Sequence, residues 1–426
     1  MAQFSTLKNA LLSNNSHLYE VVMLSGQAGP SIYVPAGNLN ASTDAFGRQR
    51  VSTPFTIFDS HNLLDENDLF DESTSGSGSS SHTVNTSSVD MAVTDASGDE
   101  VIRQSYRRMS YQPGKSMLNM NTFVFNEAKT GLRQRVGLFD SQNGIFLQQD
   151  DSAISFNLRS FVGGSASDTT ILQSSWNVDP LDGTGPSEQA LDLTKSQIMW
   201  TDLEWLGVGS VRVGFIINGQ FVLCHVFHNA NENANVYMTT PNLPIRYEIT
   251  NTAATSGAST LKQICSTVMS EGGYDARAVR QMIGTASMVS GQTVGTAYVN
   301  LVTIKLRKSG PIVLPASADI LNISNEDFEY ALFKNATPAT AFSFSNATDN
   351  VSYSLEAKTF SATGTRIGGG YLGGKTAPVN IGQDGGFNWE YQLGEDLSGV
   401  SDTVTLAIKA GGPSKNAAGI LKWLEL

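Results

Sequence analysis

The stretch VRVGFIINGQFVLCHVF (Val211–Phe227) contains two apolar runs that are separated only by Asn218 and Gly219. An Asn-Gly pair favours a two-residue type I′ turn, because both central residues of that turn need a positive φ angle. Closing the chain at this point pairs Ile217 with Gln220, and the side chains then alternate between two faces. The pattern therefore predicts an antiparallel hairpin.

The turn also predicts a register along the whole hairpin. On one face Val213 is expected opposite Cys224, and on the other face Arg212 is expected opposite His225. Both faces are at least half apolar, which is typical of strands that are covered on both sides. We therefore expect this hairpin to lie centrally in a packed sheet and not at its edge.

Length and composition limit the possible classes of protein. The 426 residues leave room for two or three domains. Only 15% of the residues are charged, against about 25% in an average soluble domain, and Gly, Ser, Thr and Asn fill the difference. The net charge of -12 argues against nucleic-acid binding, since the basic patches around Arg103 and Arg133 are short and bordered by acids. No run approaches the roughly 18 apolar residues of a membrane-spanning helix, so no membrane insertion is expected.

The spacing of strands and turns predicts an all-β fold. From Val101 onward, short alternating runs are divided by turn residues at the intervals of a β-sandwich. We predict a jelly-roll-like antiparallel β-sandwich core over residues 101–290 and a second, C-terminal β-sandwich over 291–426. The one helical stretch expected after residue 100 is Asp275–Met282.

Residues 1–100 lack an alternating run long enough to bury a core, so an extended N-terminal attachment arm is expected there. The arm contains the acidic run Asp59–Glu72, followed by the Ser/Gly-rich run Ser73–Ser81, whose composition is typical of a flexible linker. Apolar side chains within the acidic run are expected to anchor the arm to partner chains: Leu63, Leu64, Leu69 and Phe70.

Residues that could carry catalysis or bind metal are sparse. His225 and His228 are three residues apart, which on a strand places them on opposite faces and keeps them from sharing a metal ion. Asp202 and Glu204 share one face of an expected strand and could form a carboxylate pair, but the flanking tryptophans favour a packing role. The acidic run offers oxygen ligands for Ca²⁺ without EF-hand spacing, which favours a solvated or partner-facing segment. We therefore predict no enzyme activity, no metal and no cofactor.

The two cysteines, Cys224 and Cys265, do not form a disulfide framework. Each lies within an expected strand, where a free thiol behaves as a small apolar side chain. We expect both to be reduced, which fits maturation in a reducing cytoplasm.

Several segments carry a family resemblance: DAFGRQRVS (Asp44–Ser52) followed by PFTIFDS (Pro54–Ser60), SYQPGKS (Ser110–Ser116) with RVGLFDSQNGIF (Arg135–Phe146), and the stretch Trp200–Ile249, which begins WTDLEWLGVGSVRVGFIINGQF. Together they resemble virion structural proteins of tailed bacteriophages, including phages of aquatic hosts. The resemblance covers about residues 40–335 well and the C-terminal region loosely. It brings no catalytic residues to transfer.

The resemblance implies a non-enzymatic subunit that is assembled into the virion in the host cytoplasm. It implies a homo-oligomer, such as a trimer, that contacts other virion proteins as part of a tail fibre, baseplate or adaptor. One alternative is a fibre or decoration protein of the head surface or collar. Another is a receptor-binding tailspike that binds or cleaves a host-surface glycan, with the loops Asn229–Asn235 and Gly364–Gly386 as candidate contacts.

Overall fold

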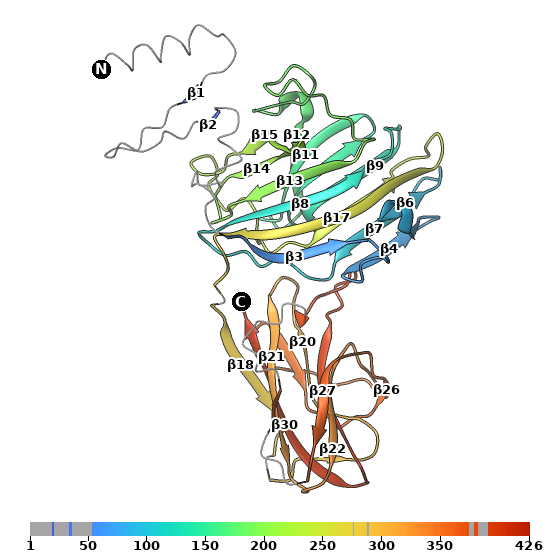
Figure 1. Ribbon diagram of the computed structural model, residues 1–426, viewed down its shortest axis with the longest axis vertical. Helices are drawn as coiled ribbons and strands as arrows, with labels where there is room; N and C mark the ends of the chain where they lie inside the picture. The colour runs from blue at the N-terminus through green and yellow to red at the C-terminus, as the bar shows by residue number, and fades with distance from the viewer. Residues whose placement is uncertain are drawn as a thin grey trace, which may run out of the picture.

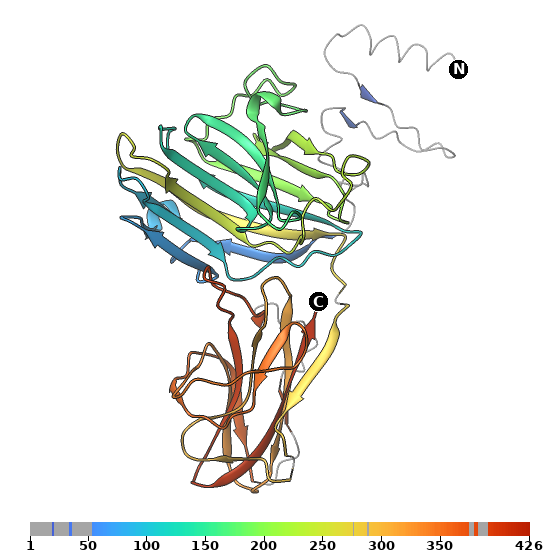
Figure 2. The same cartoon turned by 180° about the vertical axis from the view of Figure 1, so that it is seen from behind.

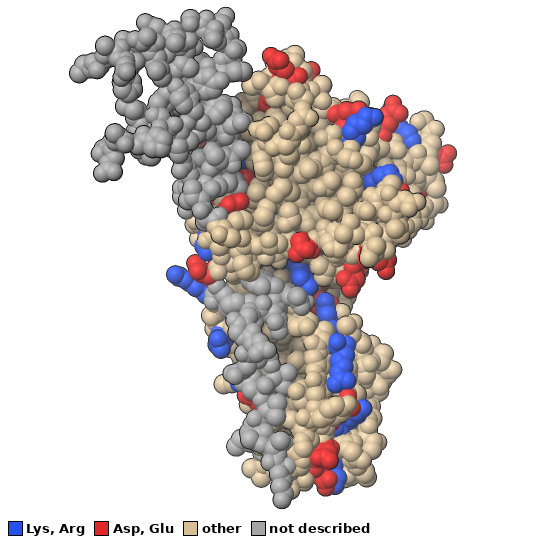
Figure 3. All heavy atoms as spheres, in the orientation of Figure 1, with Lys and Arg blue, Asp and Glu red and all other residues tan. Residues whose placement is uncertain are grey.

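The computed structural model describes residues 53–275, 277–287, 289–374 and 391–426. It also describes the backbone of three short strands: β1 (Tyr19–Glu20), β2 (Val34–Pro35) and β28 (Val379–Ile381). Strands make up nearly all of the regular structure, with short 3-10 turns such as η2 (Val84–Thr86) and η3 (Gln173–Ser175) between them. The described chain is all-β, as the sequence predicts, and forms two β-structured domains (Figure 1). Charged side chains are scattered sparsely over the described residues on the face drawn in Figure 3, in keeping with the low charged fraction of the sequence.

The N-terminal domain is an antiparallel sandwich of two sheets (Figure 1, Figure 2). The seven-stranded sheet runs in the order β12 (Ser167–Leu172), β11 (Ala153–Ser160), β10 (Gly144–Asp150), β9 (Leu132–Phe139), β16 (Ile245–Asn251), β7 (Glu100–Ser105) and β4 (Phe70–Ser75). The eight-stranded sheet runs in the order β15 (Gln220–Phe227), β14 (Val211–Ile217), β13 (Gln197–Leu203), β8 (Ser116–Val124), β17 (Ser259–Glu271), β6 (Ser88–Val93) and β5 (Ser79–Thr83), with β3 (Phe55–His61) also paired to β17. Alternating apolar side chains of both sheets, such as Phe123, Val136, Phe156 and Phe215, fill the core between them.

The C-terminal domain is also antiparallel. One sheet contains β18 (Val279–Gly284), β30 (Lys415–Glu425), β21 (Val313–Asn322) and β28, with β19 (Gln292–Val294) paired to β30. The other contains β24 (Ser345–Asn346), β25 (Val351–Ser354), β20 (Val299–Leu306), β29 (Thr403–Ala410), β22 (Phe328–Lys334) and β27 (Thr365–Leu372), and a small pair is formed by β23 (Thr337–Pro338) and β26 (Phe360–Ala362). The core of this domain includes Leu301, Ile304, Leu406 and Trp423.

The predicted hairpin is present, and its turn is confirmed. Asn218 and Gly219 have φ angles of 52° and 75°, and Ile217 pairs with Gln220. The predicted register holds as far as the pair Gly214–Leu223 and is wrong beyond it. A β-bulge at that point adds one residue to β15, so each later residue of β15 pairs one position away from the expected partner.

The hairpin's predicted central position is wrong, because β15 is a terminal strand of its sheet. The segment between η3 and β13 covers the free edge of β15. The backbone N–H groups of Val178 and Asp179 each donate to the carbonyl of Cys224 at 3.1 Å. The outer face of the hairpin is apolar because it joins a small cluster around Trp200 and Leu223. The hairpin is therefore covered by a loop and by this apolar cluster, whereas the sequence pattern predicts neighbouring strands on both sides.

The predicted N-terminal arm is wrong for residues 55–93, which form strands β3 to β6 of the sandwich. Phe70 is buried in the core, where its ring contacts Phe58 at 6.1 Å and Tyr247 at 6.4 Å between centroids. Leu69 packs against the same core, whereas Leu63 and Leu64 are exposed. These strands pair with β7 and β17, which come later in the chain, so the local pattern alone does not reveal them. Apart from β1 and β2, the predicted arm up to residue 52 lies outside the described residues.

The Ser/Gly-rich run is not a flexible linker, because it forms the end of β4, a crossing between the sheets and the start of β5. The crossing is held by Asp99, whose Oδ1 accepts a hydrogen bond from the Ser77 N–H at 2.8 Å. The helix expected at Asp275–Met282 is also wrong, since β18 begins at Val279 and pairs with β30 of the C-terminal domain. The C-terminal domain therefore begins before residue 291.

Arg108 joins the two domains. Its guanidinium forms ion pairs of 2.7 Å with Asp140 in the N-terminal sandwich and with Glu395 in the C-terminal domain. Its Nη2 also donates to the Ser309 hydroxyl at 2.9 Å. The positive charge is largely buried and has two carboxylate partners, so this contact fixes one domain against the other.

Candidate functional site

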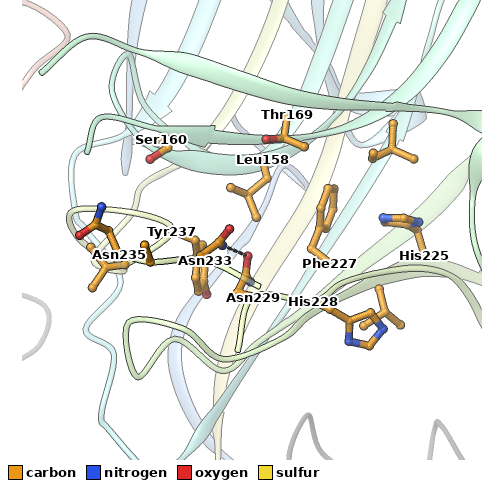
Figure 4. A pocket seen from close by; sticks show the side chains of 14 residues that line it. Leu158, Ser160, Thr169, His225, Phe227, His228, Asn229, Asn233, Asn235 and Tyr237 are labelled. Carbon is orange, nitrogen blue, oxygen red and sulfur yellow. Dashed lines mark hydrogen bonds between the residues drawn. The ribbon is translucent and has the colours of Figure 1, made fainter. Parts of the chain in front are cut away.

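A pocket of about 480 Å³ lies at one side of the N-terminal sandwich. It is bounded by β11 and β12 of one sheet, by β15 of the other sheet, and by the loop of residues 228–237 that follows β15 (Figure 4). Its volume is in the range of small-ligand sites in proteins, roughly 300–1,000 Å³. The lining residues are Leu158, Ser160, Thr169, Ile171, His225, Val226, Phe227, His228, Asn229, Asn233, Ala234, Asn235, Val236 and Tyr237.

Asparagine side chains shape the loop on one side of the pocket. The Asn229 amide donates to the Gly209 carbonyl at 2.8 Å, and its Oδ1 accepts a hydrogen bond from Asn233 Nδ2 at 3.0 Å (Figure 4). At the end of the loop, the Tyr237 N–H donates to the Gly207 carbonyl at 2.9 Å. Asn side chains can replace backbone partners in this way, which explains why an Asn-rich segment forms an ordered loop here.

The bulge in β15 places His225 on the inner face of the sheet, opposite Val213. Its ring packs edge-on against Phe227 with 4.6 Å between centroids, and its Nδ1 accepts a hydrogen bond from the Asn177 N–H at 3.2 Å. Burial, and secondarily the charge of His228, lowers the pKa of His225 to about 4. The ring is therefore neutral near pH 7, with its proton on Nε2.

The pocket lining contains no Asp, Glu, Lys or Arg. It offers amide, hydroxyl and imidazole groups beside the apolar surfaces of Leu158, Phe227 and the Tyr237 ring (Figure 4). Amides and hydroxyls both donate and accept hydrogen bonds, while aromatic rings pack against the C–H faces of a ligand. Chemically, the arrangement suits a ligand that is polar and uncharged.

The sequence predicts part of this site and misses the rest. The loop Asn229–Asn235, expected as a glycan contact, does line the pocket. The sequence does not predict Ser160 and Thr169 on the facing strands, because no local signal pairs them with the loop Asn229–Asn235 far along the chain. The second candidate loop, Gly364–Gly386, contains β27 at Thr365–Leu372, and most of its remainder lies outside the described residues. None of Leu63, Leu64, Leu69, Phe70, Asn218 or Gly219 lines the pocket.

The carboxylates that the sequence considers for glycoside cleavage lie inside the protein. Asp202 is fully buried, forms an ion pair with Arg212 and accepts a hydrogen bond from the Ser116 hydroxyl. Glu204 is 1% exposed and accepts a hydrogen bond from the Tyr111 hydroxyl at 2.7 Å. Both side chains have structural partners, which agrees with the packing role that the sequence favours.

Both cysteines are free in the structure, as the sequence predicts. Cys224 is buried in the core of the sandwich, and this burial raises the pKa of its thiol well above the usual range. Within the described residues there is no group of three or more His, Cys, Asp or Glu side chains suited to a metal ion. The described part of the chain also has no helix that is long and apolar enough to cross a membrane.

Comparisons with known proteins identify no family for this chain. No family model matches the chain, and no curated protein matches it. Among solved structures, a protein of unknown function from Shewanella oneidensis MR-1 aligns over 59% of this chain and 100% of its own, with 10% identity and a TM-score of 0.35. The carbohydrate recognition domain of Emp47p aligns over 52% and 98%, with 9% identity and a TM-score of 0.32. A beta-1,3-glucanase from Mycobacterium marinum aligns over 51% and 97%, with 8% identity and a TM-score of 0.33. At this level of similarity, these likenesses carry no argument about function.

Proposed function

We propose that this chain is a non-enzymatic virion subunit of a tailed phage that binds an uncharged saccharide in the pocket between β12 and the 228–237 loop. The observation that carries the binding role is the pocket lining, in which neutral hydrogen-bonding groups stand beside aromatic and aliphatic surface without a single carboxylate, lysine or arginine. A saccharide presents the complementary pattern of hydroxyls around C–H faces. The virion role rests on the sequence segments that resemble phage structural proteins.

Binding is favoured over cleavage by the same lining. Hydrolysis of a glycosidic bond generally uses two carboxyl groups that flank the bond, about 5–9 Å apart. The pocket lining supplies no carboxyl group, and Asp202 and Glu204 lie outside the lining and are buried among structural partners. A receptor-binding or assembly role therefore fits the site better than that of a glycan-cleaving tailspike.

An array of neutral and acidic oligosaccharides tests the binding role. We expect the wild-type protein to bind neutral oligosaccharides, and the double variant Asn235→Ala/His228→Ala to bind them at least tenfold more weakly. Both side chains are exposed in the pocket, and each lost hydrogen bond is worth about 1 kcal/mol. Glu232→Ala is the matched control, because Glu232 is exposed on the same loop but does not line the pocket. Equal binding by the double variant and the control would refute the assignment.

The virion role has a separate test. Mass spectrometry of purified particles, with antibody labelling in electron microscopy, should detect the chain at a tail, baseplate, collar or head position. Light scattering of the isolated protein should give a mass that is a multiple of 45.6 kDa, and three copies are expected. Absence from purified particles would remove the virion role without affecting the saccharide site.

A further inference from the structure

Four arginines gather on the outer face of the seven-stranded sheet, the face that points away from the sandwich core. Arg133 and Arg135 come from β9, Arg159 from β11 and Arg246 from β16. We call this set the arginine layer. Strand alternation places these residues outward, because their neighbours in sequence, such as Val136, point into the core.

The arginine layer covers two phenylalanine rings. Phe139 and Phe146 are fully buried, although both lie on the outer face of the sheet, and their ring centroids are 4.5 Å apart. The guanidinium carbons of Arg135 and Arg159 lie 5.2 Å and 5.0 Å from the Phe146 ring centroid, and that of Arg246 lies 5.5 Å from the Phe139 centroid. These cation–π contacts hold the guanidinium groups in fixed positions.

Positive charge in the layer exceeds its negative charge. Glu248 alone pairs with Arg133, Arg135 and Arg246, at 3.2, 3.3 and 3.2 Å. Asp168 pairs with Arg159 at 2.8 Å, so two carboxylates serve four guanidinium groups. Among the described residues, Asp150 lies opposite Arg133 in the register but forms no ion pair with it.

Two features describe the surroundings of individual arginines. Burial, outweighing the attraction of Glu248 and reinforced by the charges of Arg133 and Arg159, lowers the pKa of Arg135 to about 10. The Nε of Arg133 is buried and has no hydrogen-bond partner. The side chains of the four arginines nevertheless keep 12–23% of their surface exposed, so part of the layer can be reached from solvent.

We propose that the arginine layer binds an anionic group, a carboxylate or a sulfate, of an acidic saccharide. Planar guanidinium groups match the paired oxygens of either group, and an anion would supply the missing negative charge. Arg159 and Asp168 directly precede Ser160 and Thr169 in the chain, so the layer and the pocket lie on opposite faces of the same two strands. Anion binding stands on the arginines alone, whereas the choice of a saccharide rests on the proposed function.

The experiment is a titration of the full-length protein with sodium sulfate, glucuronate, galactose 6-sulfate and uncharged galactose at constant ionic strength. Binding is followed by calorimetry and by the NMR signals of the arginine Nε–H groups. We expect saturable binding of the charged probes, weakened at least fivefold in Arg133→Gln. Arg366→Gln is the control, because Arg366 is an exposed arginine in the C-terminal domain that pairs with Glu329. A backbone amide NMR spectrum that matches the wild type would show that Arg133→Gln is folded.

The outcomes separate the two proposals. No saturable binding of any anion, or an equal loss in Arg133→Gln and Arg366→Gln, would overturn the arginine-layer site. Binding of inorganic sulfate, with no binding of glucuronate or galactose 6-sulfate, would show that the layer does not recognise an acidic saccharide. Loss of neutral-sugar binding in the pocket double variant, with anion binding retained, would confirm that the two sites are independent.

Discussion

Strands β11 and β12 carry two different chemistries on their two sides. On the inner side, Ser160 and Thr169 contribute to a pocket lined by no carboxylate, lysine or arginine. On the outer side, the residues directly before them, Arg159 and Asp168, form an ion pair in a layer of four arginines. Because side chains alternate along a strand, one residue step separates a neutral site from a highly charged one. The comparison teaches that two strands can carry a neutral site on one face and an arginine-rich site on the other.

The largest expected effect of a single substitution is on the charged side. Glu248→Gln leaves Arg133, Arg135 and Arg246 without their shared counter-charge, and the Glu248 side chain is only 4% exposed. We expect a loss of about 3–5 kcal/mol in the free energy of unfolding, measured with urea at pH 7. Glu326→Gln breaks the more exposed pair with Lys415 and should cost less than about 1 kcal/mol. Similar losses in the two variants would show that Glu248 contributes no more to stability than a surface ion pair does.

A smaller effect is expected from the backbone beneath the layer. Gly144 has a φ of 150°, and an added Cβ would lie 2.1 Å from Phe139 Cβ and 2.3 Å from its Cα. Gly144→Ala should therefore lower the free energy of unfolding by about 1–3 kcal/mol, since packed atoms must move. Gly163→Ala, where a Cβ meets nothing within 4 Å, is the matched control. An unchanged unfolding midpoint in Gly144→Ala would mean that Phe139 is free to shift.

On the neutral side, stability should depend on pH through His225. Burial, with a smaller contribution from His228, lowers the pKa of His225 to about 4 from the ordinary 6.5. Between these values the unfolded chain binds a proton that the folded chain does not, so stability is lost as the pH falls from 6.5 towards 4. Urea midpoints at pH 7.5 and 5 should differ less in His225→Gln than in the wild type. His61→Gln, at an exposed histidine of β3, should keep the wild-type difference between the two midpoints. An equal difference in His225→Gln and His61→Gln would contradict the role of His225.

The smallest effect is expected for an exposed pocket residue. Asn235→Ala should change the free energy of unfolding by no more than about 0.5 kcal/mol, because the side chain is exposed. Chemical denaturation alongside the oligosaccharide array measures both consequences in one preparation. A stability loss above about 1 kcal/mol would place Asn235 among the structural asparagines of the loop.

Some of this architecture can be predicted from local sequence. Asn218-Gly219 predicts the turn, since its two positive φ angles are a property of those two residues. The bulge near Cys224 cannot be predicted in the same way, because it accompanies the pairing of that strand with Val178 and Asp179, more than 40 residues earlier. The position of Phe70 in the core likewise depends on strands that come later in the chain.

The two candidate sites show the same limit. The Asn-rich loop is visible in the sequence as a loop, but the pocket needs Ser160 and Thr169 from a different sheet. Arg133 and Arg135 appear in the sequence as a short basic patch, whereas Arg159 and Arg246 join them only through strand pairing. Alternation places each side chain on a face, and topology decides which faces meet.

The most direct test of the central claim is a crystal structure of the protein with a neutral oligosaccharide that binds on the array. The account predicts ligand density between β12 and the 228–237 loop, with hydrogen bonds to the side chains of Asn233 or Asn235. Density at another surface, with the pocket empty, would contradict it.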